Sequence, residues 1–433
     1  MRFVIENINK VHRADISLKG LTVIAGVNDS GKSTVGKLLF STVKALANTD
    51  LEKGTLQREL LLKYFSSLRA RLPRDRQFLH KVPFSYSGRL ISDWQRSGDS
   101  TQINNLLQEL VVEINQKNDL TPRIKRLILQ DIENIRACLK DDNQETALAS
   151  EIRYFIESEF MNKICSLRTE GSMVEFWMGE PDDMQLSYSI QANSINRESL
   201  SLSKGEYLQD ATYIESPLYM HLVDALLYSA DYRETKERYL FRSMVPIHVK
   251  DFAEKLNAMR YLSKENISPI IEKLVSIIGG HFAFDETTRT LSFLKDDVPF
   301  SPINIASGIK TFGVIQMLLE MDAINENKIL IWDEPENHLH PEWQIKFAEV
   351  LVELAKAGIP ILISTHSPYF MQGVRYFAVK HDMERFVNYY MADTKEDGLS
   401  VFEEVSDDLN RVFVKLAEPL NRIMNVDELR RNK

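Results

Sequence analysis

The sequence is poor in cysteine, has no long apolar run and carries no excess of positive charge. Only two cysteines occur among 433 residues, Cys138 and Cys165, and they stand in unrelated contexts. This excludes a disulfide framework and a cysteine-rich metal site, and it is typical of a reducing compartment. No apolar run approaches the roughly 18 residues that span a membrane, and MRFVIENINK at the N-terminus lacks the apolar core of a signal peptide. We therefore expect a cytoplasmic protein with no membrane partner.

A broad basic surface for nucleic acid is not indicated, because the formal net charge is −9 at pH 7. One local basic cluster, SLRARLPRDRQFLHK, stands out against this balance. Two interpretations of it stay open: contact with DNA phosphates, or an ordinary solvated face. The cations of the cluster are Arg69, Arg71, Arg74, Arg76 and Lys81.

Apolar patterning divides the chain into strand-rich and helix-rich stretches, and its 44% hydrophobic content is that of a globular protein. Residues 1–25 contain the short apolar runs of strands, whereas residues 55–168 are charged and helical in pattern. From position 301 onward, helix, strand, helix and strand follow in turn, which is typical of a parallel sheet with crossover helices. Two segments alternate as in β-hairpins: 173–192 with a turn at 181–183, and 281–294 with a turn at 285–288.

A phosphate-binding loop is predicted at GVNDSGKS, which fits G-x-x-x-x-G-K-[ST] between an apolar strand and an amphipathic helix. Backbone N–H groups of such a loop, together with the helix N-terminus, bind phosphate oxygens. Lys32 would reach the β- and γ-phosphates, and the Ser33 hydroxyl would bind Mg²⁺. The alternative is a chance match in a Gly/Ser turn. The residues expected to contact the nucleotide are Gly26, Val27, Asn28, Asp29, Ser30, Gly31, Lys32, Ser33 and Thr34.

Two further strands are predicted to end in reactive side chains. ILIWDE delivers Asp333 and Glu334 to the carboxyl end of a buried strand, the edge at which open α/β sheets bind ligands. We expect Asp333 to hold Mg²⁺ through water and Glu334 to act as general base toward the attacking water. ILISTHSP places His366 one βαβ unit later, and therefore near the γ-phosphate at the same edge. The alternative interpretation is that these are ordinary polar strand ends.

The order of these motifs resembles that of the ABC-type ATPase class, which includes SMC proteins and the overcoming-lysogenization-defect (OLD) family. In that class a Ser-Gly turn is the signature motif, which closes over the γ-phosphate held by a second subunit. The resemblance implies this role for Ser307 and Gly308 in INIASGIKTFGVIQMLLEM, with Lys310 as an assisting cation. Ile309 stands where the class usually has a second glycine. The alternative, an ordinary N-capped helix, stays open.

The stretch DEPENHLHPEWQ looks like that of OLD-like and bacterial defence ATPases rather than transporters. The resemblance places Asn337 and His338 in the D-loop, which crosses the dimer interface. Pro341 would lie in the first turn of the next helix, where its missing N–H costs nothing. His338 and His340 as metal ligands are a second interpretation, although no cysteine or third histidine accompanies them.

The resemblance covers both ends and part of the middle of the chain. It implies an α/β fold, an ABC-type P-loop ATPase head whose parallel sheet has crossover helices and an antiparallel β lobe, with a helical insertion. We divide the chain into six segments: the N-terminal part of the head with the phosphate loop (1–54), the helical insertion (55–168), the β lobe (169–217), a helical lobe (218–280), the C-terminal part of the head with the signature and switch histidine (281–400), and a helical tail (401–433).

The resemblance implies an ATP hydrolase that requires ATP and Mg²⁺ and forms an ATP-sandwich dimer or a higher homo-oligomer. We expect the sensor or scaffold subunit of an anti-phage defence system, resembling the ATPase subunits of Septu and PARIS, with a separately encoded nuclease as effector. Residues 367–433 contain no Asp-x-Asp and are short for the TOPRIM nuclease domain of OLD proteins. A DNA repair or recombination ATPase of RecF/SMC type, and a scaffold that barely hydrolyses ATP, stay open as alternatives.

Four further positions bear on the predicted nucleotide site. Asp29 stands where the class often has glycine, and an acid close to phosphates is unfavourable unless its side chain turns outward. Phe3 and His12 are candidates for the adenine contact. Ser216, after the predicted strand ATYIE, is a candidate for the Q-loop.

Overall fold

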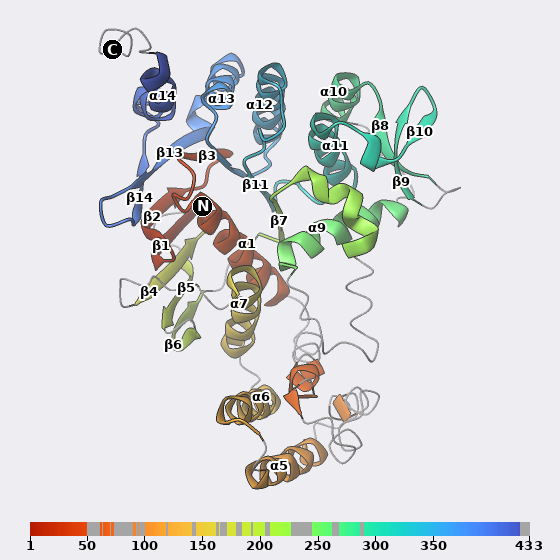
Figure 1. Ribbon diagram of the computed structural model, residues 1–433, viewed down its shortest axis with the longest axis vertical. Coiled ribbons are helices and arrows are strands. Elements are labelled where there is room, and N and C mark those ends of the chain that lie inside the picture. The colour runs from red at the N-terminus through yellow and green to blue at the C-terminus, as the bar shows by residue number, and fades with distance from the viewer. Residues whose placement is uncertain are drawn as a thin grey trace, which may run out of the picture. The chain divides into compact units, whose positions relative to one another are not determined.

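The computed structural model divides into two compact units (Figure 1). The head unit comprises residues 1–44, 155–232 and 243–433, and the helical unit comprises residues 45–154 and 233–242. This division is coarser than the six predicted segments, which stay a prediction. The structure describes residues 1–49, 61–62, 64–69, 71–72, 90–91, 94, 100–117, 120–140, 144–161, 164, 171–178, 184–191, 194–203, 208–226, 245–261, 268–285 and 290–424.

One mixed sheet of eleven strands runs through the described part of the head unit. Its strands, in order across the sheet, are β6 (Ser194–Leu202), β5 (Met184–Gln191), β4 (Ser172–Trp177), β1 (Arg2–Ile8), β2 (Val11–Ser17), β14 (Ser400–Glu404), β13 (Val387–Thr394), β3 (Leu21–Gly26), β12 (Ile361–Thr365), β11 (Lys328–Asp333) and β7 (Asp210–Ile214).

The predicted parallel sheet is confirmed in the run from β13 through β3, β12 and β11 to β7, in which every neighbouring pair is parallel. The strands β6, β5, β4, β1 and β2 are antiparallel to one another and belong to the same sheet, so the antiparallel β lobe continues the parallel part. Apolar patterning does not predict β13 and β14, which join these two halves. The predicted turn at 181–183 lies outside the described residues.

Helices cover both faces of the parallel part (Figure 1). On one face, Trp332 of β11 packs edge-on against Phe347 of α12, with ring centroids 5.3 Å apart. On the other face, α1 approaches the sheet so closely that a Cβ at Gly36 would lie 2.8 Å from Tyr213 and 3.2 Å from Ile331. The described residues of the head unit include the helices α1 (Lys32–Thr49, which continues past residue 44), α9 (Ile247–Asn257), α10 (Pro269–Ile278), α11 (Ser307–Glu320), α12 (Pro341–Lys356), α13 (Pro368–Lys380) and α14 (Asn410–Met424), with short 3₁₀ helices η1 (Pro217–Leu222), η2 (Ala258–Tyr261), η3 (Pro302–Asn304) and η4 (Glu384–Phe386).

The second predicted hairpin is confirmed as β8 (His281–Asp285) and β9 (Thr290–Lys295), which pair antiparallel. A third strand, β10 (Val298–Phe300), extends it into a small separate sheet, and residues 286–288 of the predicted turn lie outside the described residues. Pro341 opens α12 at its first position, as predicted.

The helical unit has its own core. Helix α5 (Thr101–Gln116) buries four apolar residues at helical spacing, which pack in one cluster with the apolar residues of α6 (Pro122–Lys140). Helix α7 (Gln144–Phe160) begins in this unit and ends in the head unit. No helix in the described part of the chain is both long and apolar enough to cross a membrane.

Candidate nucleotide-binding site

The phosphate loop connects β3, an interior strand of the parallel run that ends at Gly26, to α1, which begins at Lys32. The backbone is left-handed at Asp29 (φ 65°) and Gly31 (φ 86°), so the chain curls as a phosphate cradle requires. The Ser30 hydroxyl donates to the Val27 carbonyl at 2.8 Å and closes the curl. A pocket of about 270 Å³ lies at the loop, lined by Asn9, Lys10, Asn28, Asp29, Ser30, Gly31, Lys32, Ser33, Thr34 and Glu334.

Lys32 is a buried cation whose hydrogen bonds are to loop carbonyls. Its ammonium donates to the carbonyls of Gly26 at 3.1 Å and Val27 at 2.9 Å, and it lies 3.8 Å from Glu334 Oε1. Burial lowers its pKa, while the nearby carboxylates, Glu334 first, act in the opposite direction. A phosphate would satisfy this ammonium better than neutral carbonyl oxygens do, because a charged acceptor makes the stronger hydrogen bond.

Asp29, which stands where the class often has glycine, is paired with a cation. The side chain is 77% exposed and forms an ion pair with Lys10, which belongs to the turn between β1 and β2. Its negative charge is therefore balanced by Lys10, which weakens the electrostatic objection to an acid at this position. No pattern in the sequence connects Lys10 to the loop.

Asp333 ends β11, and its carboxylate accepts hydrogen bonds from two hydroxyl groups. The Tyr213 hydroxyl, from the adjacent β7, donates to Oδ2 at 3.2 Å, and the Ser364 hydroxyl, from β12 on the other side, donates to Oδ1. Burial, reinforced by the Asp333 charge, raises the pKa of Tyr213 well above its usual range, so the phenol stays a donor. Neither Tyr213 nor Ser364 is predictable from a local motif.

The residues proposed to hold Mg²⁺ fit that ion by their chemistry. Ser33 and Asp333 line one narrow pocket with Lys32, and hydroxyl and carboxylate oxygens are the ligands that Mg²⁺ prefers. When bound, Mg²⁺ would neutralise phosphate charge.

Glu334 and His366 lie side by side, as the strand order predicts. His366 Nδ1 is 3.2 Å from Glu334 Oε1, and the Asn337 side-chain amide donates to Glu334 Oε2 at 3.0 Å. Glu334 itself has a φ of 48°, an uncommon value for a residue with a side chain, and its N–H donates to the Ser364 carbonyl at 3.1 Å. The carboxylate is thus fixed on both oxygens beside the phosphate loop.

The Ser-Gly turn lies outside the residues that line this pocket. Helix α11 begins at Ser307, and its N-cap residue is Ala306, which makes no side-chain cap hydrogen bond, so the alternative of an ordinary N-capped helix is not supported. The Ser307 hydroxyl instead donates to the His338 carbonyl at 3.4 Å. A Cβ at Gly308 would lie 3.0 Å from the Trp343 ring, so this turn packs directly on the predicted D-loop and α12.

Lys310, the predicted assisting cation, is a buried side chain at the start of α11. It is only 3% exposed, and its ammonium lies 3.4 Å from His221 Nδ1 in η1. Burial lowers its pKa. The side chain therefore reaches toward η1.

The candidates for the adenine contact and the Q-loop, Phe3, His12 and Ser216, lie outside the residues that line the phosphate-loop pocket. Phe3 is fully buried and packs edge-on against Phe176, so the prediction that it contacts adenine is wrong. His12 accepts or donates a hydrogen bond at Asn7 Oδ1 and is outside the pocket lining. Ser216 is the N-cap of η1 and accepts from the Leu218 N–H at 3.2 Å.

Glu215, which precedes Ser216, is held by a buried histidine. His248 Nε2 lies 3.1 Å from Glu215 Oε2, and His248 Nδ1 lies 2.6 Å from Glu159 Oε2 at the end of α7. The hydrogen bond from His248 lowers the pKa of Glu215 to about 2. Because Ile214 pairs with Trp332, Glu215 lies at the same sheet edge as Asp333.

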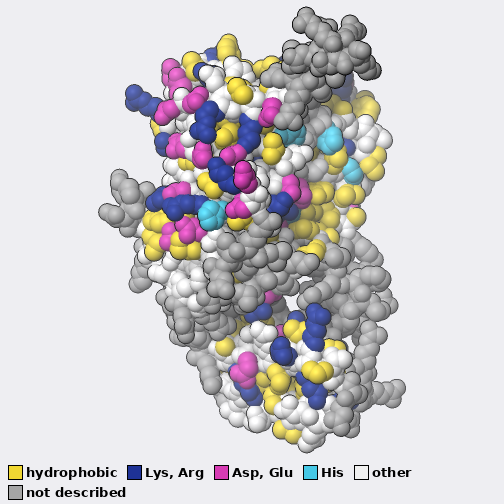
Figure 2. Space-filling model, turned by 60° about the vertical axis from the view of Figure 1, so that its left-hand side comes forward, with side chains coloured by type: hydrophobic (Ala, Val, Ile, Leu, Met, Phe, Trp, Pro, Cys, Tyr) yellow, Lys and Arg dark blue, Asp and Glu magenta, His cyan; other side chains and the backbone are white. Residues whose placement is uncertain are grey.

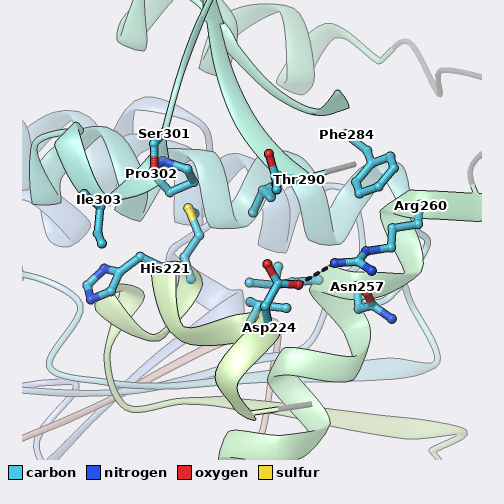
Figure 3. A pocket seen from close by; sticks show the side chains of 13 residues that line it. His221, Asp224, Asn257, Arg260, Phe284, Thr290, Ser301, Pro302 and Ile303 are labelled. Atoms are coloured by element: carbon cyan, nitrogen blue, oxygen red, sulfur yellow. Dashed lines mark hydrogen bonds and ion pairs between the residues drawn. The ribbon is translucent and has the colours of Figure 1, made fainter. Parts of the chain in front are cut away.

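A second pocket, of about 160 Å³, lies between η1, α9 and the small sheet (Figure 3). Arg260 forms an ion pair with Asp224 there, and its guanidinium lies 5.1 Å from the centre of the Phe284 ring. Among the described lining residues, Arg260 is the one Lys or Arg side chain, and it is already paired and stacked.

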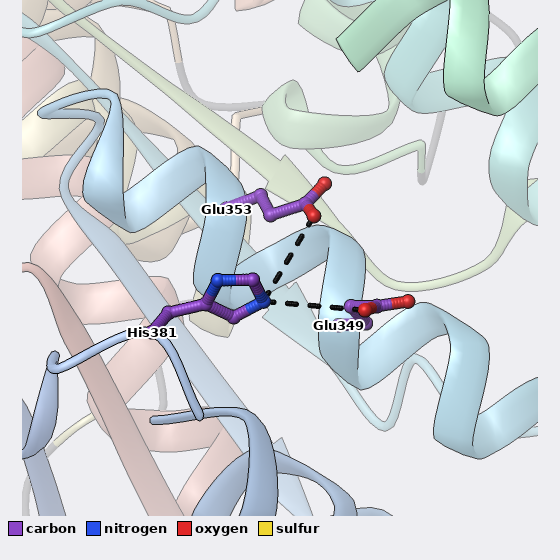
Figure 4. Close-up of side chains that lie close together, drawn as sticks. All are labelled: Glu349, Glu353 and His381. Carbon is purple, nitrogen blue, oxygen red and sulfur yellow. Dashed lines mark ion pairs between the residues drawn. The ribbon is translucent and has the colours of Figure 1, made fainter. Parts of the chain in front are cut away.

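The described residues contain one group of three potential metal ligands, Glu349, Glu353 and His381 (Figure 4). His381 Nε2 is 4.0 Å from both carboxylates, whereas the Lys273 ammonium is 3.0 Å from Glu349 and 2.8 Å from Glu353. Lys380 adds a further ion pair to Glu349 at 3.0 Å. The group is therefore an ion-pair network between helices. His338 and His340 belong to no such metal-ligand group within the described ranges.

The basic cluster, for which contact with DNA phosphates and an ordinary solvated face stayed open, is engaged inside the helical unit through Arg71. Arg71 donates to Asp131 Oδ2 at 2.7 Å and to the Leu127 carbonyl at 3.2 Å. Arg74, Arg76 and Lys81 lie outside the described residues. Over the head unit, Figure 2 shows Lys and Arg interspersed with Asp and Glu, so the described residues of that face form no broad area of one sign.

A phosphate loop after the interior parallel strand β3, with acids at the end of β11, two strands away across the sheet, defines a P-loop ATPase fold. The chain belongs to the AAA ATPase domain family, whose model matches residues 1–371. None of the curated proteins matches it.

Solved structures are similar to the chain over most of its length. The SMC head domain from Thermotoga maritima has a TM-score of 0.39 at 10% identity, covering 93% of this chain and 98% of that one. The Smc head domain of Pyrococcus furiosus, with an extended coiled coil and bound to the C-terminal domain of ScpA, has a TM-score of 0.40 at 9% identity, covering 99% and 98%.

Proposed function

We propose that the chain is an ABC-type ATPase that binds and hydrolyses ATP between the heads of two copies arranged head to tail. The observation that carries this proposal is the position of Glu334. Its carboxylate is held by Asn337, lies 3.2 Å from His366, and lines the phosphate-loop pocket with Lys32. A fixed carboxylate beside the phosphates is what activation of an attacking water requires.

In this mechanism each role is assigned to particular residues of the chain. The loop N–H groups and Lys32 bind the phosphates, and Ser33 and Asp333 hold Mg²⁺. Glu334 orients the attacking water and accepts its proton, and His366 contacts Glu334 and the γ-phosphate region. Tyr213 and Ser364 hold the Asp333 carboxylate in place through their hydroxyl groups.

The second copy completes the site in this proposal. Ser307 and Gly308 are outside the lining of their own pocket; Ser307 donates to the carbonyl of His338, and Gly308 packs on Trp343 and Leu339. We assign them to the γ-phosphate of the ATP held by the other copy, at the N-terminus of α11, where a helix dipole favours an anion.

We place this ATPase in an anti-phage defence system as the sensor or scaffold subunit, with a separately encoded nuclease as effector. Support comes from the resemblance of DEPENHLHPEWQ to defence ATPases of the Septu and PARIS kind. In this role ATP binding orders the dimer and hydrolysis releases or activates the partner.

The test is Glu334→Gln, compared with the matched control Glu342→Gln on the exposed first turn of α12. We expect kcat to fall about 100- to 10,000-fold in the first variant only, with a dimer that accumulates in ATP by native mass spectrometry. Equal turnover of wild type and Glu334→Gln would refute the assignment. A monomer at saturating ATP would refute the dimer.

A further inference from the structure

A second glutamate in the turn after β11, Glu336, is buried and acts as an acceptor. It is 3% exposed, and its Oε1 accepts three hydrogen bonds from one segment, residues 365–367. The donors are the Thr365 hydroxyl, the His366 N–H at 3.0 Å and the Ser367 N–H at 3.2 Å. Burial raises the pKa of this carboxyl, while the hydrogen bonds donated by Thr365 and His366 act in the opposite direction.

The three donors belong to the connection between β12 and α13, which carries His366. The imidazole Nδ1 of His366 is 3.2 Å from Glu334 Oε1 and 3.8 Å from Glu336 Oε1. Ser367 also accepts from the Phe370 N–H at 3.2 Å and donates to Gln344 at 2.6 Å, which fixes the far end of the segment. Both glutamates come from a single turn, so they set the distance between this turn and the histidine.

The other oxygen of Glu336, Oε2, is buried without a hydrogen-bond partner among the described residues. Glu336 thus holds the segment through one oxygen alone. Glutamine at this position would keep an acceptor oxygen where Oε1 is, whereas leucine would leave three donors unsatisfied.

We propose that Glu336 is a positioning residue for ATP hydrolysis, which holds residues 365–367 so that the His366 side chain stays beside Glu334. The inference rests on the proposed function, because the residue acts through His366 and does not touch the nucleotide pocket. Glu336 is not among the residues that line the phosphate-loop pocket.

The experiment is a double-mutant cycle on kcat with wild type, Glu336→Leu, His366→Ala and the double variant. We expect Glu336→Leu to lower kcat about 10- to 100-fold with KM for ATP nearly unchanged, and Glu336→Gln to recover most of that loss. In the His366→Ala background the same leucine should cost less than about twofold, because the two residues act as a unit. An undiminished loss in that background would overturn the proposal.

Amide hydrogen exchange supplies a readout that does not depend on activity. Glu336→Leu should speed exchange at the His366 and Ser367 amides while the amides of β3 keep wild-type protection. Unchanged exchange at 366 and 367 would overturn the proposal. A wild type that does not turn over ATP would instead refute the proposed function, and exchange would still decide whether Glu336 holds the segment.

Discussion

A ring of four charges anchors the carboxyl-terminal half of α1, the helix that follows the phosphate loop. The Lys44 ammonium lies 2.7 Å from Asp210 and 2.7 Å from Asp251, and the Lys255 ammonium lies 2.7 Å and 2.9 Å from the same two carboxylates. Positive and negative groups alternate around the ring, which connects α1, β7 and α9. We predict that Lys44→Met destabilises the head unit strongly.

The magnitude follows from burial. The four side chains are 11–20% exposed, so little water replaces a lost partner. Removing one partner of a buried pair costs about 3–5 kcal/mol. Lys255 still bridges both aspartates in the variant, so we expect the lower end, about 3 kcal/mol in the free energy of unfolding.

The pH dependence has a definite sign. Burial by itself would raise the pKa of Asp210, but the Lys255 and Lys44 charges lower it overall. Its stabilisation is therefore present above the ordinary aspartate range and is lost as the pH falls through the lowered value. The difference between wild type and Lys44→Met should accordingly be large at pH 7 and shrink in acid.

The assay is urea unfolding followed by tryptophan fluorescence, which reports chiefly on the head unit because Trp177, Trp332 and Trp343 lie in it. Lys346→Met is the matched control: its partner Glu342 is 2.9 Å away, but both side chains are exposed, and we expect no measurable loss. Equal losses in the two variants, or a Lys44→Met loss that does not change with pH, would refute the reasoning.

Two further predictions concern the second copy and the buried histidine. Ser307→Arg should abolish turnover while ATP affinity stays within about twofold of wild type. Affinity is measured by nucleotide titration, with Ser301→Arg at an exposed position as the control. A loss of ATP binding would instead mean that Ser307 acts at the pocket of its own chain. Burial by itself would lower the pKa of His248, but the hydrogen bonds that its ring N–H groups donate to Glu159 and Glu215 raise it overall, so its stabilisation is present below the ordinary histidine range and is lost as the pH rises through the raised value. The gap in Tm between wild type and His248→Gln should therefore be wider at pH 6 than at pH 9, and a constant gap would exclude this account.

The parts of the site predicted from sequence are those that follow a buried strand. Lys32, Asp333, Glu334 and His366 each come just after an apolar run, so a local pattern finds them, and parallel pairing brings them to one edge. The sheet as a whole was only partly predictable: β13 is buried on both faces and shows no alternation that would mark it as a strand.

The site residues that the sequence did not predict have partners that are far away in sequence, and no spacing rule connects them to those partners. Tyr213 meets Asp333 across two strands that are 120 positions apart in sequence, and Glu215 meets a histidine on a helix that packs beside its strand. Glu336 belongs to a recognised motif, yet its role depends on three donors in residues 365–367, which only the folded sheet places against it.

The strand order also explains why the Ser-Gly turn differs from every other element of the site. Strands β3, β12, β11 and β7 are parallel neighbours, so the loops after them meet at one edge and supply Lys32, His366, Glu334 and Glu215. Ser307 follows η3 and opens a helix rather than following a sheet strand, so parallel pairing cannot bring it to that edge. Because Ser307 and Gly308 lie outside the lining of their own phosphate-loop pocket, the proposed function assigns this turn to the ATP of a second copy.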